Sequence, residues 1–260
     1  MKSLSRDRPS LEALIENEDL GFEILHPGGT GITQELADLC SVGAGSYVLD
    51  VACGTGESAC YIAEQFRARL AGVDASAYMI ARAQEKAKNK GLQIEFKEAD
   101  ALHLPFADDT FDAVISECTV CLLDKERAIH EMIRVTKPGG SIGFHDICWQ
   151  NNPPDHLKNR LAEIEGEQPE TLEGWKMLCE RAGLVEVQAM DRSALIPPWM
   201  KESISRLNLA AMVRIVSRIA GKWGIQGLLD AWESERIFQS RYTGYGLLVG
   251  RKPWSRSPGR

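Results

Sequence analysis

The stretch Leu49-Asp50-Val51-Ala52-Cys53-Gly54-Thr55-Gly56 decides the fold, because a buried apolar run meets a glycine-rich turn there. The residues from Tyr47 onward are typical of a strand, and residues 57–67 have the apolar spacing of a helix. Glycines in such a turn let the backbone approach a ligand without a Cβ clash. The following helix offers unpaired N–H groups at its start. We therefore expect a ligand-binding turn at the first strand–helix junction of an α/β domain.

Strand and helix patterns alternate downstream of this turn. The expected strands are residues 47–52, 70–74, 93–97, 112–117, 141–147, 185–190 and 245–250. The expected helices include residues 57–67, 76–90, 125–135 and 171–182, and Pro138-Gly139-Gly140 is predicted to be a tight turn before the fifth strand. Alternation of this kind produces a parallel sheet covered by helices on both faces. We predict an α/β fold with a Rossmann-like, mostly parallel seven-stranded sheet whose last strand runs antiparallel.

Four segments divide the chain around this sheet. Residues 1–45 are expected to be an N-terminal helical segment over the ligand site, interrupted by His26-Pro27-Gly28-Gly29-Thr30-Gly31, which cannot continue a helix. Residues 46–194 and 242–253 form the predicted core. Residues 195–241, inserted between the last two strands, are too long for a simple loop and predict a helical lid. Residues 254–260 are expected to be a frayed tail.

Three acidic residues follow successive predicted strands, at the edge where open α/β sheets bind ligands. Asp50 lies where a carboxylate could accept hydrogen bonds from a cationic amine. Asp74, eighteen residues past Gly56, is placed to accept both hydroxyls of a ribose. Asp100 could accept the exocyclic amine of an adenine, with Leu102 packed on the ring.

The ordered set of motifs resembles the class I S-adenosylmethionine-dependent methyltransferases, and within them the small-molecule group that includes ubiquinone- and menaquinone-biosynthesis enzymes. The motifs are the run from Asp50 to Gly56, Asp74, Asp100, Pro105-Phe106 with Phe111-Asp112, and Arg134-Val135 with Pro138-Gly139-Gly140. The resemblance covers about residues 48–147. It implies methyl transfer from S-adenosylmethionine to a small molecule, with S-adenosylhomocysteine as the product.

The resemblance also implies which residues bind the cofactor. The predicted cofactor-binding residues are Asp50, Ala52, Gly54 and Gly56 at the methionine half, Asp74 and Ala75 at the ribose, Met79, Asp100 and Ala101 at the adenine, and Glu117 with Cys118 beside the sulfonium. Gly29 is added because the turn around His26 could fold over the methionine end. One position departs from the family, which usually has glycine where this chain has Ala52.

Glu117, Cys118 and His145 are the candidate catalytic residues. His145 and Asp146 end the fifth strand, and only one of these neighbours can face the site. Cys118 and Cys121 form a CxxC without the second pair that a zinc site needs, so no metal site is predicted.

A second resemblance, to arsenite methyltransferases, makes Cys118 a candidate for binding a soft acceptor, with Cys60 and Cys148 as further thiols. The alternatives are therefore an arsenite methyltransferase, a non-catalytic S-adenosylmethionine-binding protein, and an NAD(P)-dependent oxidoreductase. The last remains open because Gly54-Thr-Gly56-Glu-Ser-Ala59 fits the dinucleotide fingerprint.

Composition limits the remaining classes. The chain has 260 residues, of which 44% are hydrophobic, enough for one catalytic domain. Its net charge of −7 argues against general nucleic-acid binding. No apolar run is long enough for a transmembrane helix, and seven scattered cysteines suit a reducing, cytoplasmic environment. The oligomeric state is left open.

Overall fold

The computed structural model describes residues 26–199, 201 and 209–254. Within this part of the chain, eight strands form one sheet in the order β3-β2-β1-β4-β5-β8-β7, with β6 paired to β5. The strands are β1 (Tyr47–Val51), β2 (Arg69–Asp74), β3 (Glu95–Glu98), β4 (Phe111–Glu117), β5 (Thr136–Trp149), β6 (Glu170–Thr171), β7 (Val185–Asp191) and β8 (Thr243–Arg251).

Strand direction brings the ends of several strands to one edge of the sheet. The neighbours from β3 to β5 are all parallel, whereas β8 is antiparallel to both β5 and β7. In this register Glu117, the last residue of β4, lies opposite His145 of β5. The parallel strands therefore present their carboxyl ends together, at the edge where Asp74 ends β2.

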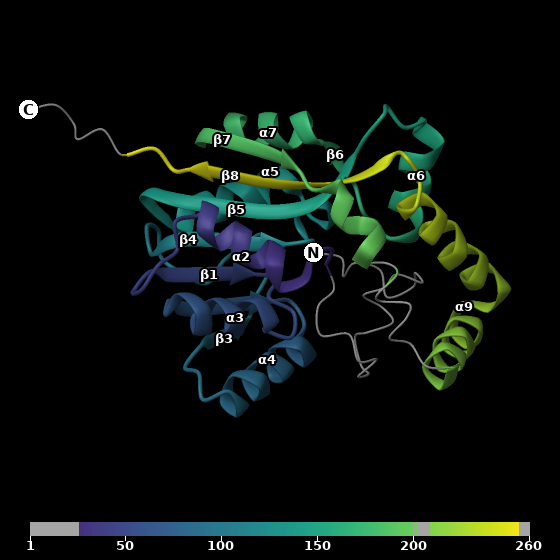
Figure 1. The fold of residues 1–260 in the computed structure, drawn as a ribbon, viewed down its shortest axis with the longest axis horizontal. Helices are drawn as coiled ribbons and strands as arrows, with labels where there is room; N and C mark the ends of the chain where they lie inside the picture. Colours follow the sequence, from purple (N-terminus) through teal and green to yellow (C-terminus); the bar gives the residue numbers. More distant parts are fainter. Residues whose placement is uncertain (1–25, 200, 202–208, 255–260) are drawn as a thin grey trace, which may run out of the picture.

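Helices cover both faces of the sheet (Figure 1). The helices of the described residues are α2 (Gly29–Leu39), α3 (Glu57–Phe66), α4 (Ala77–Asn89), α5 (Lys125–Val135), α6 (Asp155–Ile164), α7 (Leu172–Arg181) and α9 (Leu209–Phe238), with short 3-10 turns η1 (Val120–Leu122) and η2 (Ser193–Leu195). In Figure 1, α2 and α3 lie in front of the sheet, and α5 and α7 lie behind it. The predicted Rossmann-like α/β fold with an antiparallel last strand is confirmed.

The prediction of seven strands is wrong, because the sheet has an eighth strand, β6. This strand has two residues, and it pairs in parallel with Cys148 and Trp149 of β5. Two residues are too few to show an alternating apolar pattern, so the sequence gives no strand signal there. The side chain of Thr171 also accepts a hydrogen bond from Gly174 N at 3.0 Å and so caps α7, as a helix-start residue does.

Two glycine-containing turns also differ from the predictions. Pro138-Gly139-Gly140 does not precede the fifth strand but lies inside β5, where the register with β4 shifts between Phe111 and Ala113. The extra residues form a bulge, the place where a sheet tolerates proline. Gly28, with φ of 89°, is the N-cap of α2, which begins at Gly29. The second half of the 26–31 run is therefore helical, contrary to the prediction.

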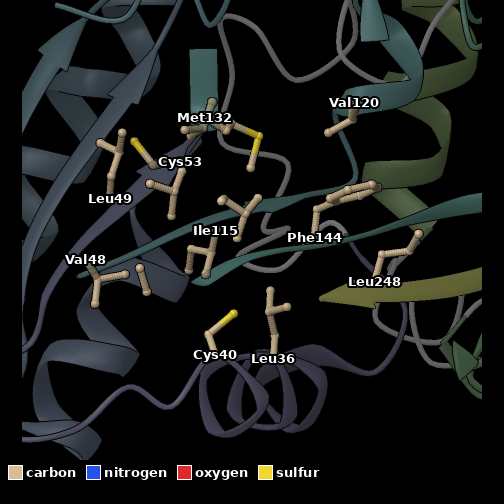
Figure 2. Close-up of a cluster of buried hydrophobic side chains, with 14 of the residues drawn as sticks. Leu36, Cys40, Val48, Leu49, Cys53, Ile115, Val120, Met132, Phe144 and Leu248 are labelled. Carbon is tan, nitrogen blue, oxygen red and sulfur yellow. The ribbon is translucent and has the colours of Figure 1, made fainter. Parts of the chain in front are cut away.

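The hydrophobic core lies between the sheet and its covering helices. Figure 2 shows Leu36 and Cys40 extending from α2 toward the sheet, in which Ile115 lies. Leu36 is fully buried, and a Cβ on Gly143 of β5 would come within 2.7 Å of its Cδ1. The absence of a side chain at this glycine lets α2 approach the sheet closely, which fixes the position of the segment that precedes α2.

Helix α9 lies beyond the carboxyl ends of the parallel strands, next to α6 (Figure 1). Arg160 of α6 donates to Glu233 at 2.8 Å and also binds Asp230, both on α9. Within α9, Gly224 has non-helical angles and marks a kink. Among the described residues, no helix is long and apolar enough to span a membrane.

The predicted segments are visible only in part. Residues 1–25 of the N-terminal segment, residues 200 and 202–208 of the lid, and residues 255–260 of the tail lie outside the described residues.

Replacing Leu36 by alanine is expected to destabilise the fold by about 2–5 kcal/mol, because a buried leucine leaves a cavity between α2 and the sheet. The measurement is urea unfolding followed by circular dichroism. Met177→Ala on α7 is the matched control, since this side chain is 49% exposed and its loss should cost less than about 0.5 kcal/mol. Equal stability of the Leu36→Ala variant and the control would contradict the packing described.

Candidate functional site

The turn after β1 combines three left-handed residues. Ala52, Gly54 and Gly56 have φ angles of 59°, 51° and 74°. A Cβ on Gly54 would meet nothing within 4 Å, whereas one on Gly56 would lie 2.8 Å from the Cβ of Ala83. Gly54 therefore borders open space, and Gly56 lets α3 pack against α4. An alanine in the left-handed region costs about 1–2 kcal/mol, which is a physical reason for the glycine that the family usually has at position 52.

Asp74 connects the end of β2 to this turn. Its Oδ2 accepts a hydrogen bond from Gly54 N at 2.9 Å, and its Oδ1 accepts one from Ser76 N at 2.9 Å. The Ser76 side chain accepts a bond from Met79 N at 3.4 Å and caps α4. The predicted ribose-binding carboxylate thus also fixes the conformation of the glycine turn.

The residues predicted to bind adenine lie after β3 and on α4. The Oδ1 atom of Asp100 accepts a bond from Leu102 N at 2.9 Å, which orders the loop after the strand. Leu102 is buried, and Ala101, Asp100 and Met79 are half-buried, while Ala75 is exposed. The structure therefore brings the predicted adenosine residues to the ends of two neighbouring strands, β2 and β3.

Asp50 is a buried carboxyl that lacks a full set of partners. It is 2% exposed, and its Oδ2 has no hydrogen-bond partner. Burial, together with the charges of Glu117 and Asp74, holds the pKa of Asp50 well above its ordinary value. An unsatisfied buried carboxyl is unfavourable, and a cationic group bound beside it would remove that cost. This orphaned oxygen fits the amine of an S-adenosylmethionine molecule.

Glu117 is the centre of a polar cluster at the end of β4. Its Oε1 accepts hydrogen bonds from Thr33 Oγ1 at 2.8 Å and from His145 Nε2 at 2.7 Å. Its Oε2 accepts one from Ser58 Oγ and lies 3.3 Å from His26 Nε2. These donors come from α2, α3, β5 and the residue that precedes Pro27, so several elements meet at one carboxylate.

A second layer of polar groups lies behind His145. Its Nδ1 is hydrogen-bonded to Tyr245 OH, and the same hydroxyl lies 3.3 Å from Cys118 Sγ. The side chain of His145 is fully buried. Because Nε2 donates to Glu117, Nδ1 accepts the bond from Tyr245, and His145 is neutral in this arrangement.

The charges of the cluster follow from these contacts. Burial would raise the pKa of Glu117, but the electrostatic attraction of His26 and the hydrogen bonds from the two histidines hold it well below its ordinary value. Burial lowers the pKa of His26, but Glu117 outweighs this effect and the net shift is upward. For His145, burial prevails and lowers the pKa. Glu117 is therefore ionised, His26 is more basic than an ordinary histidine, and His145 is neutral.

His26, Glu117 and His145 also present nitrogen and oxygen atoms within 4.8 Å of one another, a spacing that a metal ion accepts. Hydrogen bonding already explains each approach, since each imidazole can donate its Nε2–H to a different carboxylate oxygen. We therefore describe the three residues as a hydrogen-bonded network.

The cysteines do not form the thiolate site that the arsenite hypothesis needs. Cys118, Cys60 and Cys148 are free thiols, and in the described part of the chain no three cysteines come together as potential ligands. Burial holds the pKa of Cys118 well above its ordinary value and raises that of Cys148 to about 12. Cys118 has φ of 51°, so the backbone just after Glu117 is strained.

His145 and Asp146 point to opposite faces of β5, as the sequence predicts. His145 contacts Glu117, whereas Asp146 accepts bonds from Cys121 N and Ile147 N, both at 2.8 Å. Burial raises the pKa of Asp146 to about 6. Asp146 therefore orders the turn after β4 from the face of β5 opposite to His145.

Four members of the cluster were not among the predicted site residues. The turn around His26 is predicted to fold over the methionine end of the cofactor, but no role is predicted for Thr33, Ser58 or Tyr245. Ser58 directly follows the glycine turn, and this proximity was the one available signal. Packing of α2 brings His26 and Thr33 to Glu117, and β8 brings Tyr245 to His145.

The chain matches the Methyltransferase domain family over residues 48–140. It is 29% identical over 239 residues to methyltransferase GfsG of Streptomyces halstedii, covering 88% of this chain and 82% of GfsG. It is 36% identical over 177 residues to an uncharacterized protein of Haemophilus influenzae, covering 65% of this chain and 70% of that protein.

A solved structure shares the fold. Phosphoethanolamine N-methyltransferase 2 of Haemonchus contortus, in complex with S-adenosyl-L-methionine, aligns with a TM-score of 0.72 at 18% identity, covering 92% of this chain. The chain spans 56% of that enzyme's length.

The chain therefore belongs to the class I S-adenosylmethionine-dependent methyltransferases, and S-adenosylmethionine is its cofactor. It is an enzyme that transfers a methyl group to a small-molecule acceptor, as the sequence predicts. The comparisons do not favour the oxidoreductase, the arsenite methyltransferase or the non-catalytic alternative.

The thiols of half-buried Cys118 and buried Cys121 should react slowly with iodoacetamide at neutral pH, because desolvation holds the pKa of both well above its ordinary value. Mass spectrometry of the native protein is expected to find both unlabelled until guanidinium unfolds the chain. An Asp155→Cys variant supplies the positive control, since that side chain is 89% exposed. Rapid native labelling at Cys118 would show instead a reactive thiolate.

Proposed function

We propose that S-adenosylmethionine binds across the carboxyl ends of β1, β2 and β4 and presents its methyl group to an acceptor beside Glu117. The orphaned Oδ2 of Asp50 is the observation that carries this proposal. Bound S-adenosylmethionine supplies an electrophilic methyl group on a positively charged sulfur. The chain binds, orients and excludes water, which suffices for much of the acceleration because the methyl donor is already activated.

At the methionine half, Asp50 would accept hydrogen bonds from the ammonium group, and this ion pair would satisfy its buried oxygen. Gly54 borders open space, so the backbone of the turn can approach the ligand. We include Ala52 and Gly56 of the same turn, and Gly29, which begins α2.

At the adenosine half, Asp74 would bind the ribose hydroxyls in addition to the backbone contacts that its carboxylate makes. Ala75 and Met79 would pack along the adenosine. The loop of Asp100 and Ala101 would receive the adenine edge. Support comes from the adjacency of β2 and β3, which places these residues at one edge.

On the acceptor side, we assign Glu117 as the group nearest the methyl group. The side chain of His145 is fully buried and donates to Glu117, so it would act by fixing that carboxylate. Cys118 would act through its strained backbone, which turns the chain at the end of β4.

The described part of residues 195–241 would form a lid over the acceptor, together with the described residues 26–45 of the N-terminal segment. Helix α9 keeps exposed apolar side chains at Met212, Val213, Val216, Ile225, Leu229 and Trp232. An acceptor with apolar parts would suit such a lid. A cytoplasmic location is supported by the free state of all seven cysteines.

Calorimetric titration tests the cofactor site. S-adenosylmethionine and S-adenosylhomocysteine are each expected to bind at one site, and NAD is expected not to bind. Release of S-adenosylhomocysteine in a coupled assay would then identify acceptors. Binding of NAD alone would overturn the proposal.

Asp74→Ala should weaken S-adenosylmethionine binding by roughly 1–3 kcal/mol, the range for losing a charged hydrogen-bond partner. Asp74→Asn separates the ribose-binding role of this residue from its role in the glycine turn, since the amide oxygen can still accept the hydrogen bond from Gly54 N. Asp155→Ala is the control, because its carboxylate is 89% exposed on α6. An unchanged affinity of the Asp74→Ala protein would show that the ribose lies elsewhere.

A further inference from the structure

Glu117 is saturated with hydrogen-bond donors. Thr33 and His145 donate to Oε1, while Ser58 donates to Oε2 and His26 lies beside it. A carboxylate has about four lone-pair sites, and here four side chains face them. Its pKa lies well below the ordinary value, so Glu117 stays ionised. Glu117 therefore suits a fixed negative charge better than a group that takes up a proton.

His145 has no nitrogen left to accept a substrate proton. Its Nε2 donates to Glu117 at 2.7 Å, and its Nδ1 is hydrogen-bonded to Tyr245. Its side chain is fully buried. This histidine holds Glu117 in place from the side of β5.

His26 differs from His145 in one respect. Its Nε2 faces Glu117 at 3.3 Å, but its Nδ1 is buried without a hydrogen-bond partner. When the Nε2–H donates to Glu117, a lone pair remains on Nδ1. A carboxylate that fixes one imidazole nitrogen and leaves the other available is the arrangement by which a histidine acts as a base. His26 immediately precedes the Pro27–Gly28 turn, whose glycine caps α2, so its backbone position is fixed.

We propose that His26 is the general base for a hydroxyl acceptor, an alcohol or a phenol, and that Glu117 orients its ring. The inference rests on the proposed function and deepens it. The acceptor oxygen forms a bond to the methyl carbon as the sulfur–carbon bond breaks, and that electron pair stays on sulfur. The hydroxyl proton passes to Nδ1 of His26. The products are the methyl ether, neutral sulfur and protonated His26.

The charge balance of the step favours this assignment. The positive charge leaves the sulfur and reappears on His26, so the net charge beside Glu117 does not change. A buried site with a fixed charge stabilises such a step without reorganising. A base is needed because a hydroxyl keeps its proton at neutral pH.

Several groups face His26 and determine its proton affinity. Burial lowers its pKa, but Glu117 and the backbone of Pro27 raise it above the ordinary 6.5. The ring of His145 lies 4.8 Å away between centroids, and Tyr245 and Cys118 lie behind it, both uncharged because burial raises each pKa. A bound sulfonium is a second positive charge and must lower the pKa of His26 again. At pH values between the pKa of His26 in the free protein and its pKa in the complex, S-adenosylmethionine binding should then release a proton.

Titration calorimetry in buffers of different ionisation enthalpy measures the number of protons that ligand binding releases, and it needs no methyl acceptor. Above pH 6.5, S-adenosylmethionine binding is expected to release up to about one proton more than S-adenosylhomocysteine binding. The difference in proton release between the two ligands reports the effect of the sulfonium charge alone, because both ligands carry the ammonium group proposed to face Asp50. His26→Gln should abolish the difference, since glutamine can still donate toward Glu117 but has no basic atom. His156→Gln on the exposed side of α6 is the control and should retain it.

Equal proton release for the two ligands, or an unchanged difference in His26→Gln, would overturn the assignment of His26. Absence of any S-adenosylmethionine binding would instead contradict the proposed function. Thermal unfolding followed by circular dichroism confirms that the His26→Gln protein is folded. His26→Asn is the second variant, because its shorter side chain places the amide differently from that of glutamine.

Turnover supplies the second readout. With the best hydroxyl acceptor from the screen, His26→Gln should lose roughly 100- to 10,000-fold in kcat at neutral pH, with the affinity for S-adenosylmethionine changed less than about threefold. The wild-type rate should rise with pH through the pKa of His26, and that limb should vanish in the variant. A loss of less than threefold would contradict the base role. The base role would also be contradicted if EDTA removed the wild-type activity and a divalent metal ion restored it.

Discussion

The carboxylate of Glu117 joins parts of the chain that are distant in sequence. Side chains from α2, α3 and β5 donate to it, and His26 pairs with it from the turn before α2. Each donor gains a strong charged acceptor, while the carboxylate gains the partners that make its burial tolerable. The position of the N-terminal turn, the start of α3 and the end of β4 therefore depend on one another.

The same edge of the sheet holds two carboxyls in opposite states. Asp50 has an unpartnered oxygen, and burial with two nearby acids raises its pKa. Glu117 has a full set of donors, and its pKa is lowered. A ligand with an ammonium and a sulfonium brings positive charge to both. Asp50 therefore lacks a partner until a ligand binds, whereas hydrogen bonds hold Glu117 in place before the cofactor binds. A charge that is fixed in advance stabilises a reaction without having to reorganise.

Much of the fold follows from local sequence signals. The glycine turn and the helices over residues 76–90 and 125–135 were predicted at or near their observed positions, because they depend on nearby residues. The two-residue β6 and the bulge at Pro138-Gly139-Gly140 were missed or misplaced, because each depends on pairing with another strand. The same limit applies to the site. Residues at strand ends could be predicted, whereas Tyr245 reaches His145 from β8, a hundred residues away.

The structure of the protein in complex with S-adenosylhomocysteine and a bound acceptor would test the central claim most directly. The account predicts ribose hydroxyls on Asp74, the amine on Asp50, and the sulfur directed toward Glu117, with the acceptor oxygen within hydrogen-bonding distance of His26. A ligand held away from the ends of β1 and β2, or an acceptor on the far side of Glu117 from His26, would contradict it.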